Sequence, residues 1–201
     1  PAYRGCRWAA QDEEDRRWIE ELKPRLDADE QKIASRLEQL YQEHWSGLPI
    51  PVDVVEIVNW SGANSILRNL GGGHLLVSTS YQGPAALEAV FHEASHLFMG
   101  RGAPVRQALD QAASAADFRL PGDLWHVVLF YTTGAVVRGI LDNGGESGYT
   151  PMLYGIFERG TWVGYRAALE NTWLPYIDGK RTLAQAAAGL IKALRSQGQT
   201  Q

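Results

Sequence analysis

Residues 84–99 read PAALEAVFHEASHLFM, and the fold predicted for the chain is built around this stretch. Its two histidines, His92 and His96, are four positions apart, which is close to one turn of an α-helix. Pro84 stands near the first helical position, where its missing N–H costs nothing. The sequence therefore predicts a helix over about 85–99, with both imidazoles on nearly the same face.

The motif His-Glu-x-x-His within this helix has the pattern of a zinc site. Zinc accepts imidazole nitrogen at about 2.0–2.1 Å, and a helix holds two such ligands one turn apart. Glu93 projects beside the pair, so its carboxylate can act as general base on metal-activated water. With five histidines in the chain, a chance match is on the order of one per cent. We expect Zn²⁺ bound by His92 and His96, with Glu93 as the catalytic base.

A catalytic zinc usually has three protein ligands, so the motif lacks one. The metzincin pattern is excluded, because Met99 and Gly102 stand where it needs glycine and histidine. His126 is the preferred third ligand, since it lies in the apolar segment 124–141, where an unpaired imidazole would be costly to bury. Four carboxylates stay open as alternatives: Glu146, Glu158, Glu170 and Asp123.

Other side chains could support such a site. Asp123 stands about one turn before His126 and could orient it, or could only cap the helix. Tyr131 and Tyr149 are candidate donors to a developing oxyanion. Tyr149 lies in a glycine-rich stretch, from which a loop could reach the site. Of the remaining histidines, His74 is expected on a solvated edge strand, and His44 is expected to be structural.

The whole chain predicts an α+β fold, mostly helical, with a small antiparallel sheet before the motif helix. Residues 8–45 carry apolar side chains at helical spacing, so we expect one long amphipathic helix or two that meet near Pro24. The β-branched, alternating run VDVVEIVNW at 52–60 predicts a strand. Shorter strands are expected at 65–70 and 74–80, joined by glycine-containing turns.

Four helices are expected after the motif helix. They cover, in chain order, about 105–118, 124–141, 162–176 and 183–195. The last begins with the capping box Thr182-Leu183-Ala184-Gln185. There is no internal repeat or low-complexity linker, so a single domain over 1–201 is the simplest organisation. It would comprise an N-terminal helical segment, 1–46, and a core over 50–195 that contains the metal site.

Composition excludes several classes of protein. The formal net charge of −4 and the pI near 5.7 do not suggest a phosphate-binding surface, so nucleic acid is not an expected partner. Cys6 is the only cysteine, which excludes an intrachain disulfide and a cysteine-based zinc site. No uninterrupted apolar run approaches the roughly 18 residues of a membrane span. The compartment stays open between the periplasm or cell exterior, after removal of a signal peptide, and the cytoplasm.

The succession of strands and a His-Glu-x-x-His helix resembles the zincin superfamily of metallopeptidases. More specifically, three blocks together resemble a group of uncharacterised bacterial proteins that often carry an export signal: FHEASH at 91–96, LWH at 124–126 with FYT at 130–132, and WLPYIDGK at 173–180. The resemblance covers roughly 50–195. It implies a zincin-like bacterial protein, and it supports His126 as a ligand because this residue belongs to the second block.

The leading functional hypothesis is hydrolysis of a peptide or related amide bond, with a peptide or protein as substrate. The strand over 75–80 could pair with an extended substrate. One alternative is a zinc-containing binding or structural module, with seven Trp and eight Tyr available for recognition. Another is a metal-dependent hydrolase of a non-peptide substrate, which shares the same metal chemistry.

Overall fold

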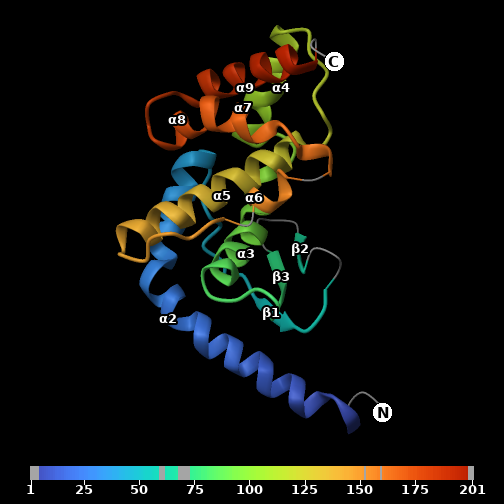
Figure 1. The fold of residues 1–201 in the computed structure, drawn as a ribbon, viewed down its shortest axis with the longest axis vertical. Coiled ribbons are helices and arrows are strands. Elements are labelled where there is room, and N and C mark those ends of the chain that lie inside the picture. Colours follow the sequence, from blue (N-terminus) through green and yellow to red (C-terminus); the bar gives the residue numbers. More distant parts are fainter. Residues whose placement is uncertain (1–4, 59–61, 68–72, 152, 159, 199–201) are drawn as a thin grey trace.

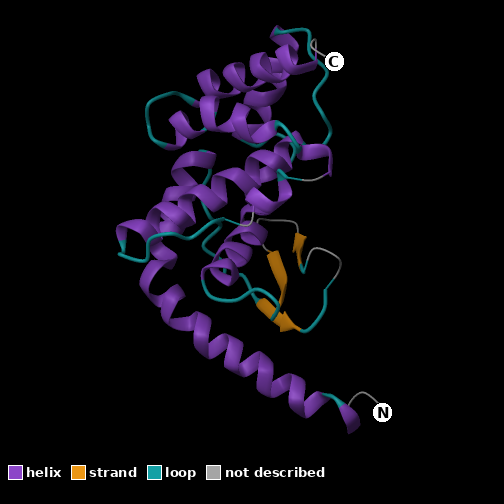
Figure 2. Ribbon diagram, viewed as in Figure 1, coloured by secondary structure: helices purple, strands orange, loops and turns teal. Residues whose placement is uncertain are grey.

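A long helix, a small sheet and a stack of helices follow one another along the chain (Figure 1; Figure 2). The computed structural model describes residues 5–58, 62–67, 73–151, 153–158 and 160–198. Its elements are, in chain order, α2 (Trp8–Tyr41), β1 (Val52–Val55), β2 (Ala63–Leu67), β3 (Gly73–Ser78), α3 (Pro84–Ser95), the 3₁₀ turn η1 (His96–Met99), α4 (Pro104–Ala115), α5 (Leu124–Asn143), α6 (Leu153–Ile156), the 3₁₀ turn η2 (Gly160–Trp162), α7 (Tyr165–Thr172), α8 (Leu174–Ile177) and α9 (Leu183–Gly198).

The N-terminal helix α2 is continuous through Pro24, which decides between the two predicted arrangements. One apolar stripe of α2 is buried, and the helix packs on α3 and α5 through it. The helix ends at Tyr41 because Gln42 adopts left-handed backbone angles (φ 54°, ψ 38°) and returns its N–H to the carbonyl of Glu38. The first part of α2 extends past the sheet, toward the N-terminus (Figure 1).

The sheet has the order β1-β3-β2, with β1 parallel to β3 and β2 antiparallel to it. The prediction of a purely antiparallel sheet was therefore wrong for the first pair. The physical reason is that β3 has the most buried side chains, with Leu75 and Val77 at 1% and 0% exposure, and takes the centre of the sheet. The part of the predicted second strand at 68–70 lies outside the described residues.

The motif helix α3 lies at the centre of the molecule, between the sheet, α2 and α5 (Figure 1). Every side chain from Ala86 to Ser95 is buried. The helix was predicted to reach Met99, but its last turn tightens from α to 3₁₀ geometry at His96. The α+β class is confirmed, and the motif histidines lie on a helix with no solvent-facing side in its second half.

Helix α5, which was predicted over the apolar segment 124–141, is mostly buried. By length and composition it could also cross a membrane, and 61% of its apolar window is buried inside the protein. Core helices of globular proteins pass the same test, so this is weak evidence for a span. The expectation that the chain has no membrane span stays a prediction.

The last part of the chain departs from the single helix expected over 162–176. Gly164, at φ 96°, begins α7, and Pro175 lies in the first turn of a separate short helix, α8. The capping box of α9 is confirmed: Thr182 Oγ1 accepts from the N–H of Gln185 at 3.2 Å, and Gln185 Oε1 accepts from the N–H of Thr182 at 2.9 Å.

Candidate metal centre

Of the candidate ligands, His92 lies on α3 and His96 is the first residue of η1, which directly continues α3. The composition of this segment favours a helix. Alanine, leucine and glutamate dominate 85–94, and all three are strong helix formers. His92 and His96 therefore lie one turn apart, with ring centroids separated by 5.1 Å. His96 is the residue at which α3 becomes 3₁₀, but its own backbone angles are still helical (φ −58°, ψ −25°). The change in geometry thus leaves the two imidazoles on one side of the helix.

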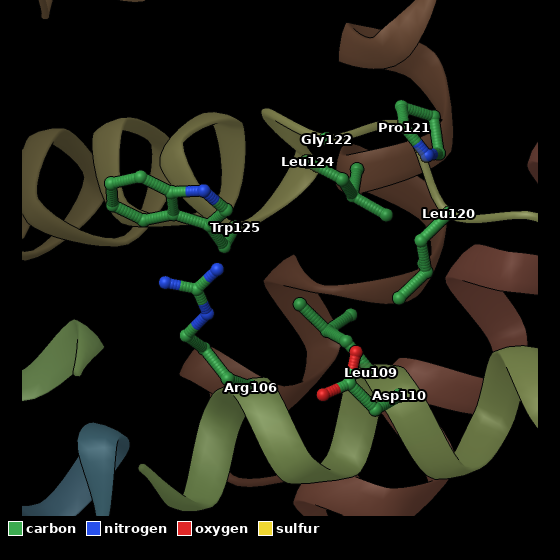
Figure 3. Close-up of a pocket in the computed structure, with 8 residues that line it drawn as sticks. All are labelled: Arg106, Leu109, Asp110, Leu120, Pro121, Gly122, Leu124 and Trp125. Atoms are coloured by element: carbon green, nitrogen blue, oxygen red, sulfur yellow. The ribbon is translucent and has the colours of Figure 1, made fainter. Parts of the chain in front are cut away.

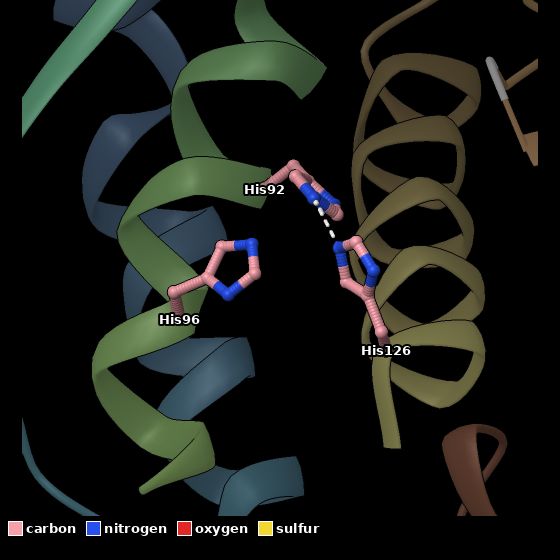
Figure 4. A group of neighbouring side chains, drawn as sticks. All are labelled: His92, His96 and His126. Carbon is pink, nitrogen blue, oxygen red and sulfur yellow. Dashed lines mark hydrogen bonds between the residues drawn. The ribbon is translucent and has the colours of Figure 1, made fainter. Parts of the chain in front are cut away.

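The third histidine comes from the first turn of α5, which packs against α3 (Figure 4). His126 Nε2 lies 3.3 Å from His92 Nε2. One nitrogen from each of His92, His96 and His126 can be chosen such that all three lie within 4.8 Å of one another. Two nitrogens at about 2.0–2.1 Å from a tetrahedral zinc ion would be about 3.3 Å apart. The His92–His126 pair therefore already has the separation that a shared ion needs, and the third imidazole lies close to the same point.

Burial keeps these imidazoles neutral. It lowers the pKa of His92 well below the usual range, and neighbouring His96 and His126 lower it further. The pKa of His96 is lowered to about 4 by burial and by His126. That of His126 is also lowered to about 4 by burial, although Asp123 opposes the shift. Because metal ligation needs the neutral ring, the cluster is in the correct protonation state at neutral pH.

An aromatic cluster formed by Trp125, Phe130 and Trp162 surrounds the histidines. The ring of Phe130 lies 3.7 Å from that of His92, between centroids. Trp125 stacks on His126 at 5.1 Å, and Trp162 stands perpendicular to the same imidazole at 5.5 Å. These contacts restrict how the imidazoles can rotate. The sequence reasoning missed all three rings, although Phe130 is four residues after His126 and so on the same face of α5.

Glu93, the predicted general base, is buried beside the cluster at 7% exposure. Its Oε2 lies 3.9 Å from His96 Nε2. Burial raises the pKa of Glu93 to about 7, while a hydrogen bond with the Ser65 side chain acts in the opposite direction. Ser65 belongs to β2, so the sheet helps to hold this carboxylate. Nothing in the sequence pointed to Ser65.

No family model, curated protein or solved structure matches the chain. The resemblance to zincins therefore rests on the motif blocks, and the geometry of the site carries the functional argument that follows.

Three of the alternative third ligands do not belong to the cluster. Glu146 pairs with Arg25 of α2, and Glu170 pairs with Arg166 at 2.9 Å. Glu158 is exposed. Among the residues that the structure describes, none of these carboxylates belongs to the group of candidate metal ligands. The structure therefore favours His126.

Asp123, the fourth alternative, lies near His126 without joining the ligand group. Its Oδ2 accepts a hydrogen bond from Trp162 Nε1 at 2.5 Å. Its charge also acts to raise the pKa of His126. Asp123 therefore holds the indole that lies against His126, which is compatible with the predicted orienting role, and it makes no side-chain capping hydrogen bond at the start of α5.

The two tyrosines predicted as oxyanion donors have different surroundings. Tyr131 is 2% exposed and follows His126 by five residues, which corresponds to a rotation of about 140° around the helix. Tyr149 donates its hydroxyl to Glu88 Oε2 at 2.5 Å, so its loop does reach α3, one turn before His92. A catalytic role for either tyrosine stays a prediction.

The other two histidines lie outside the cluster. His74 Nε2 is 2.8 Å from Asp53 Oδ2, and the residue lies on the central strand β3, so the expectation of an edge strand was wrong. His44 is exposed, with Nδ1 3.5 Å from Glu38 Oε1. Both residues provide internal controls for experiments on the three clustered histidines.

Proposed function

We propose that the chain is a zinc-dependent hydrolase with a zincin-like fold, in which His92, His96 and His126 hold the metal and Glu93 is the general base. The observation that carries the proposal is the convergence of three neutral imidazoles from two helices, with ligand atoms within 4.8 Å of one another. Imidazole nitrogen suits zinc but also copper, nickel and iron. Zinc is proposed because it is the usual metal of this motif.

The number of ligands supports catalysis over a structural site. Structural zinc is almost always held by four protein ligands, whereas catalytic zinc has three and keeps one position for water or substrate. In the described part of the chain, the candidate group contains three residues and no fourth His, Cys, Asp or Glu. When bound, zinc would supply Lewis acidity, lowering the pKa of a water molecule toward about 7 and polarising a carbonyl.

Glu93 would move the proton. Its carboxylate is fixed by Ser65 and lies beside His96 rather than in the ligand group, so it stays available as a base. It would accept a proton from the attacking water on one carboxylate oxygen and deliver it to the leaving amine. Burial removes competing solvent from around this transfer.

Peptides are the proposed substrates, but the prediction that the strand over 75–80 pairs with them was wrong. Residues 75–77 of β3 are paired with β1 on one side and with β2 on the other, so this part of the strand has no free edge. Strand β2 is at the edge of the sheet, and its Ser65 contacts Glu93. An extended peptide that paired with the outer edge of β2 would therefore run beside the general base.

Replacing Glu93 by glutamine tests the proposal, because the amide keeps the shape and removes the basic oxygen. We expect Glu93→Gln to bind zinc as the parent does. Its rate of cleavage of a peptide mixture, measured by mass spectrometry, should be lower by about 10²–10⁴-fold. His44→Ala, at an exposed site, is the matched control and should keep both properties. Full activity in Glu93→Gln would remove Glu93 from the mechanism, and absence of zinc from the parent would refute the metal site.

A further inference from the structure

A cavity of about 150 Å³ adjoins the aromatic cluster at Trp125 (Figure 3). It lies between α4, the first turn of α5 and the segment that joins them. Much of its lining is apolar, with Leu109, Leu120 and Leu124 among the lining residues. Its volume corresponds to roughly five water molecules, which is enough for one substrate side chain.

The cavity also contains a cation, Arg106 of α4 (Figure 3). The guanidinium carbon lies 4.7 Å from the ring centroid of Trp125, and Nη1 donates to the carbonyl of Met99 at 3.0 Å. These two contacts fix the half-buried side chain but use few of its five N–H donors. Within the described ranges, Arg106 has no ion pair. It is therefore a positioned cation with donors to spare.

One indole ring links this cation to the candidate metal ligands. Trp125 stacks on His126 at 5.1 Å and meets the edge of His96 at 5.7 Å. The guanidinium carbon of Arg106 is 4.7 Å from the indole centroid. Its distance from the His96 ring is therefore at most this value plus the 5.7 Å between the indole and that ring. A substrate group in the cavity would lie one or two residues from a bond held at the metal.

Asp110 sets a limit on what the cavity can take. It lies one turn after Arg106 on the same helix, is exposed, and is the single acidic residue among the described lining residues. It is not paired with Arg106 at salt-bridge distance. Its charge opposes anion binding at long range, where solvent screens it, while Arg106 can form direct, charge-assisted hydrogen bonds.

We propose that this cavity is a specificity subsite in which Arg106 binds a carboxylate of the substrate, so that the enzyme prefers peptides with a carboxylate close to the cleaved bond. The inference rests on the proposed hydrolase function. The carboxylate can come from an acidic side chain or from a free C-terminus, since both present the same two oxygens to a guanidinium.

Dicarboxylates test the subsite without any need for turnover. One carboxylate would bind the zinc-loaded protein at the metal and the other at Arg106. We expect the best-fitting diacid in the series from succinate to suberate to bind about tenfold more tightly than the monoacid of equal carbon number, measured by calorimetry. Arg106→Gln should abolish this difference and leave the monoacid affinity unchanged. Asp110→Asn should enlarge the difference.

The controls distinguish loss of the subsite from loss of the metal site. Arg101→Gln removes an exposed cation nearby and should leave the preference intact. Arg106→Lys keeps the charge and should restore part of the preference, and thermal unfolding shows that each variant is folded. Equal affinity for diacid and monoacid in the parent would overturn the subsite alone, whereas failure of both to bind would overturn the open metal position and the subsite with it.

Binding of two tripeptides to zinc-loaded Glu93→Gln distinguishes the two sources of the carboxylate, an acidic side chain and a free C-terminus. One has a glutamate side chain and an amidated end, and the other has glutamine and a free end. Tighter binding of either one, lost in the double variant with Arg106→Gln, supports the proposal and identifies the source. Equal binding of both and of an uncharged tripeptide would contradict it.

Discussion

Helices α2 and α3 differ in where their ionisable side chains lie, at the surface or in the interior. Several charged side chains of α2 pair with each other at the surface, as in Lys23–Asp27 at 2.6 Å, where both side chains are more than 60% exposed. Helix α3 instead buries two carboxylates and an imidazole, Glu88, His92 and Glu93, at 7% exposure or less. Burial of such groups opposes folding unless they are hydrogen-bonded, paired or neutralised. The comparison indicates that α2 supports the fold, while α3 contains the buried groups on which the proposed chemistry depends.

The largest expected difference concerns packing. Leu87 of α3 is fully buried, so Leu87→Ala should destabilise the protein by about 2–5 kcal/mol in denaturant unfolding, because it removes apolar contacts and leaves a cavity. Ile19 of α2 is 47% exposed, and Ile19→Ala should cost far less. Equal losses would show that the exposed side of α2 is covered in solution.

The next effect concerns the metal. His126→Ala should weaken zinc binding at least a hundredfold, which corresponds to about 2.7 kcal/mol, because one of three proposed ligands is lost. Competition with a chelating dye measures it. His74→Ala, whose imidazole faces Asp53, is the control. If both variants lose zinc equally, the site is not the one described.

A smaller effect is expected where α2 makes a buried polar contact. Trp18 Nε1 donates to the carbonyl of Tyr81, just before α3, and the indole is 7% exposed. Trp18→Phe keeps most of the apolar surface and removes the donor, so it should cost about 1 kcal/mol of unfolding free energy. An unchanged stability would mean that water replaces the indole N–H.

The smallest effect belongs to the surface of α2. Lys23→Gln removes the ion pair with Asp27, and exposed pairs of this spacing contribute about 0.3–0.5 kcal/mol at low salt. The loss should disappear at high ionic strength, because the salt screens the pair. A loss above about 1 kcal/mol would contradict the view of α2 as a solvated support.

The sequence was informative where a local rule decides the structure. The spacing of His92 and His96 follows from helix geometry, and the capping box of α9 follows from backbone hydrogen bonding at a helix start. His126 was found because an apolar helix makes an unpaired imidazole costly. Each of these predictions depends on residues that are close in the chain or on burial that composition reveals.

The sequence was uninformative where distant segments decide the structure. The parallel pairing of β1 with β3 depends on which strand takes the centre of the sheet, and no local pattern states this. Ser65 reaches Glu93 only because β2 lies at that edge. The break before α8 could have been predicted from Pro175, because proline has no N–H with which to continue α7 and is tolerated only in the first turn of a helix.

The arrangement of the three histidines has a consequence for chain topology. His92 and His126 are 34 positions apart, and the segment between them contains η1 and α4. An ion held by both would close this segment into a loop, as a disulfide does, in a chain whose single cysteine cannot form an intrachain one. Unlike a disulfide, the ion would dissociate when the chain unfolds, so it would stabilise the folded state through its free energy of binding, which grows with the concentration of free metal. The same ion would then link α3 to α5 in the folded protein.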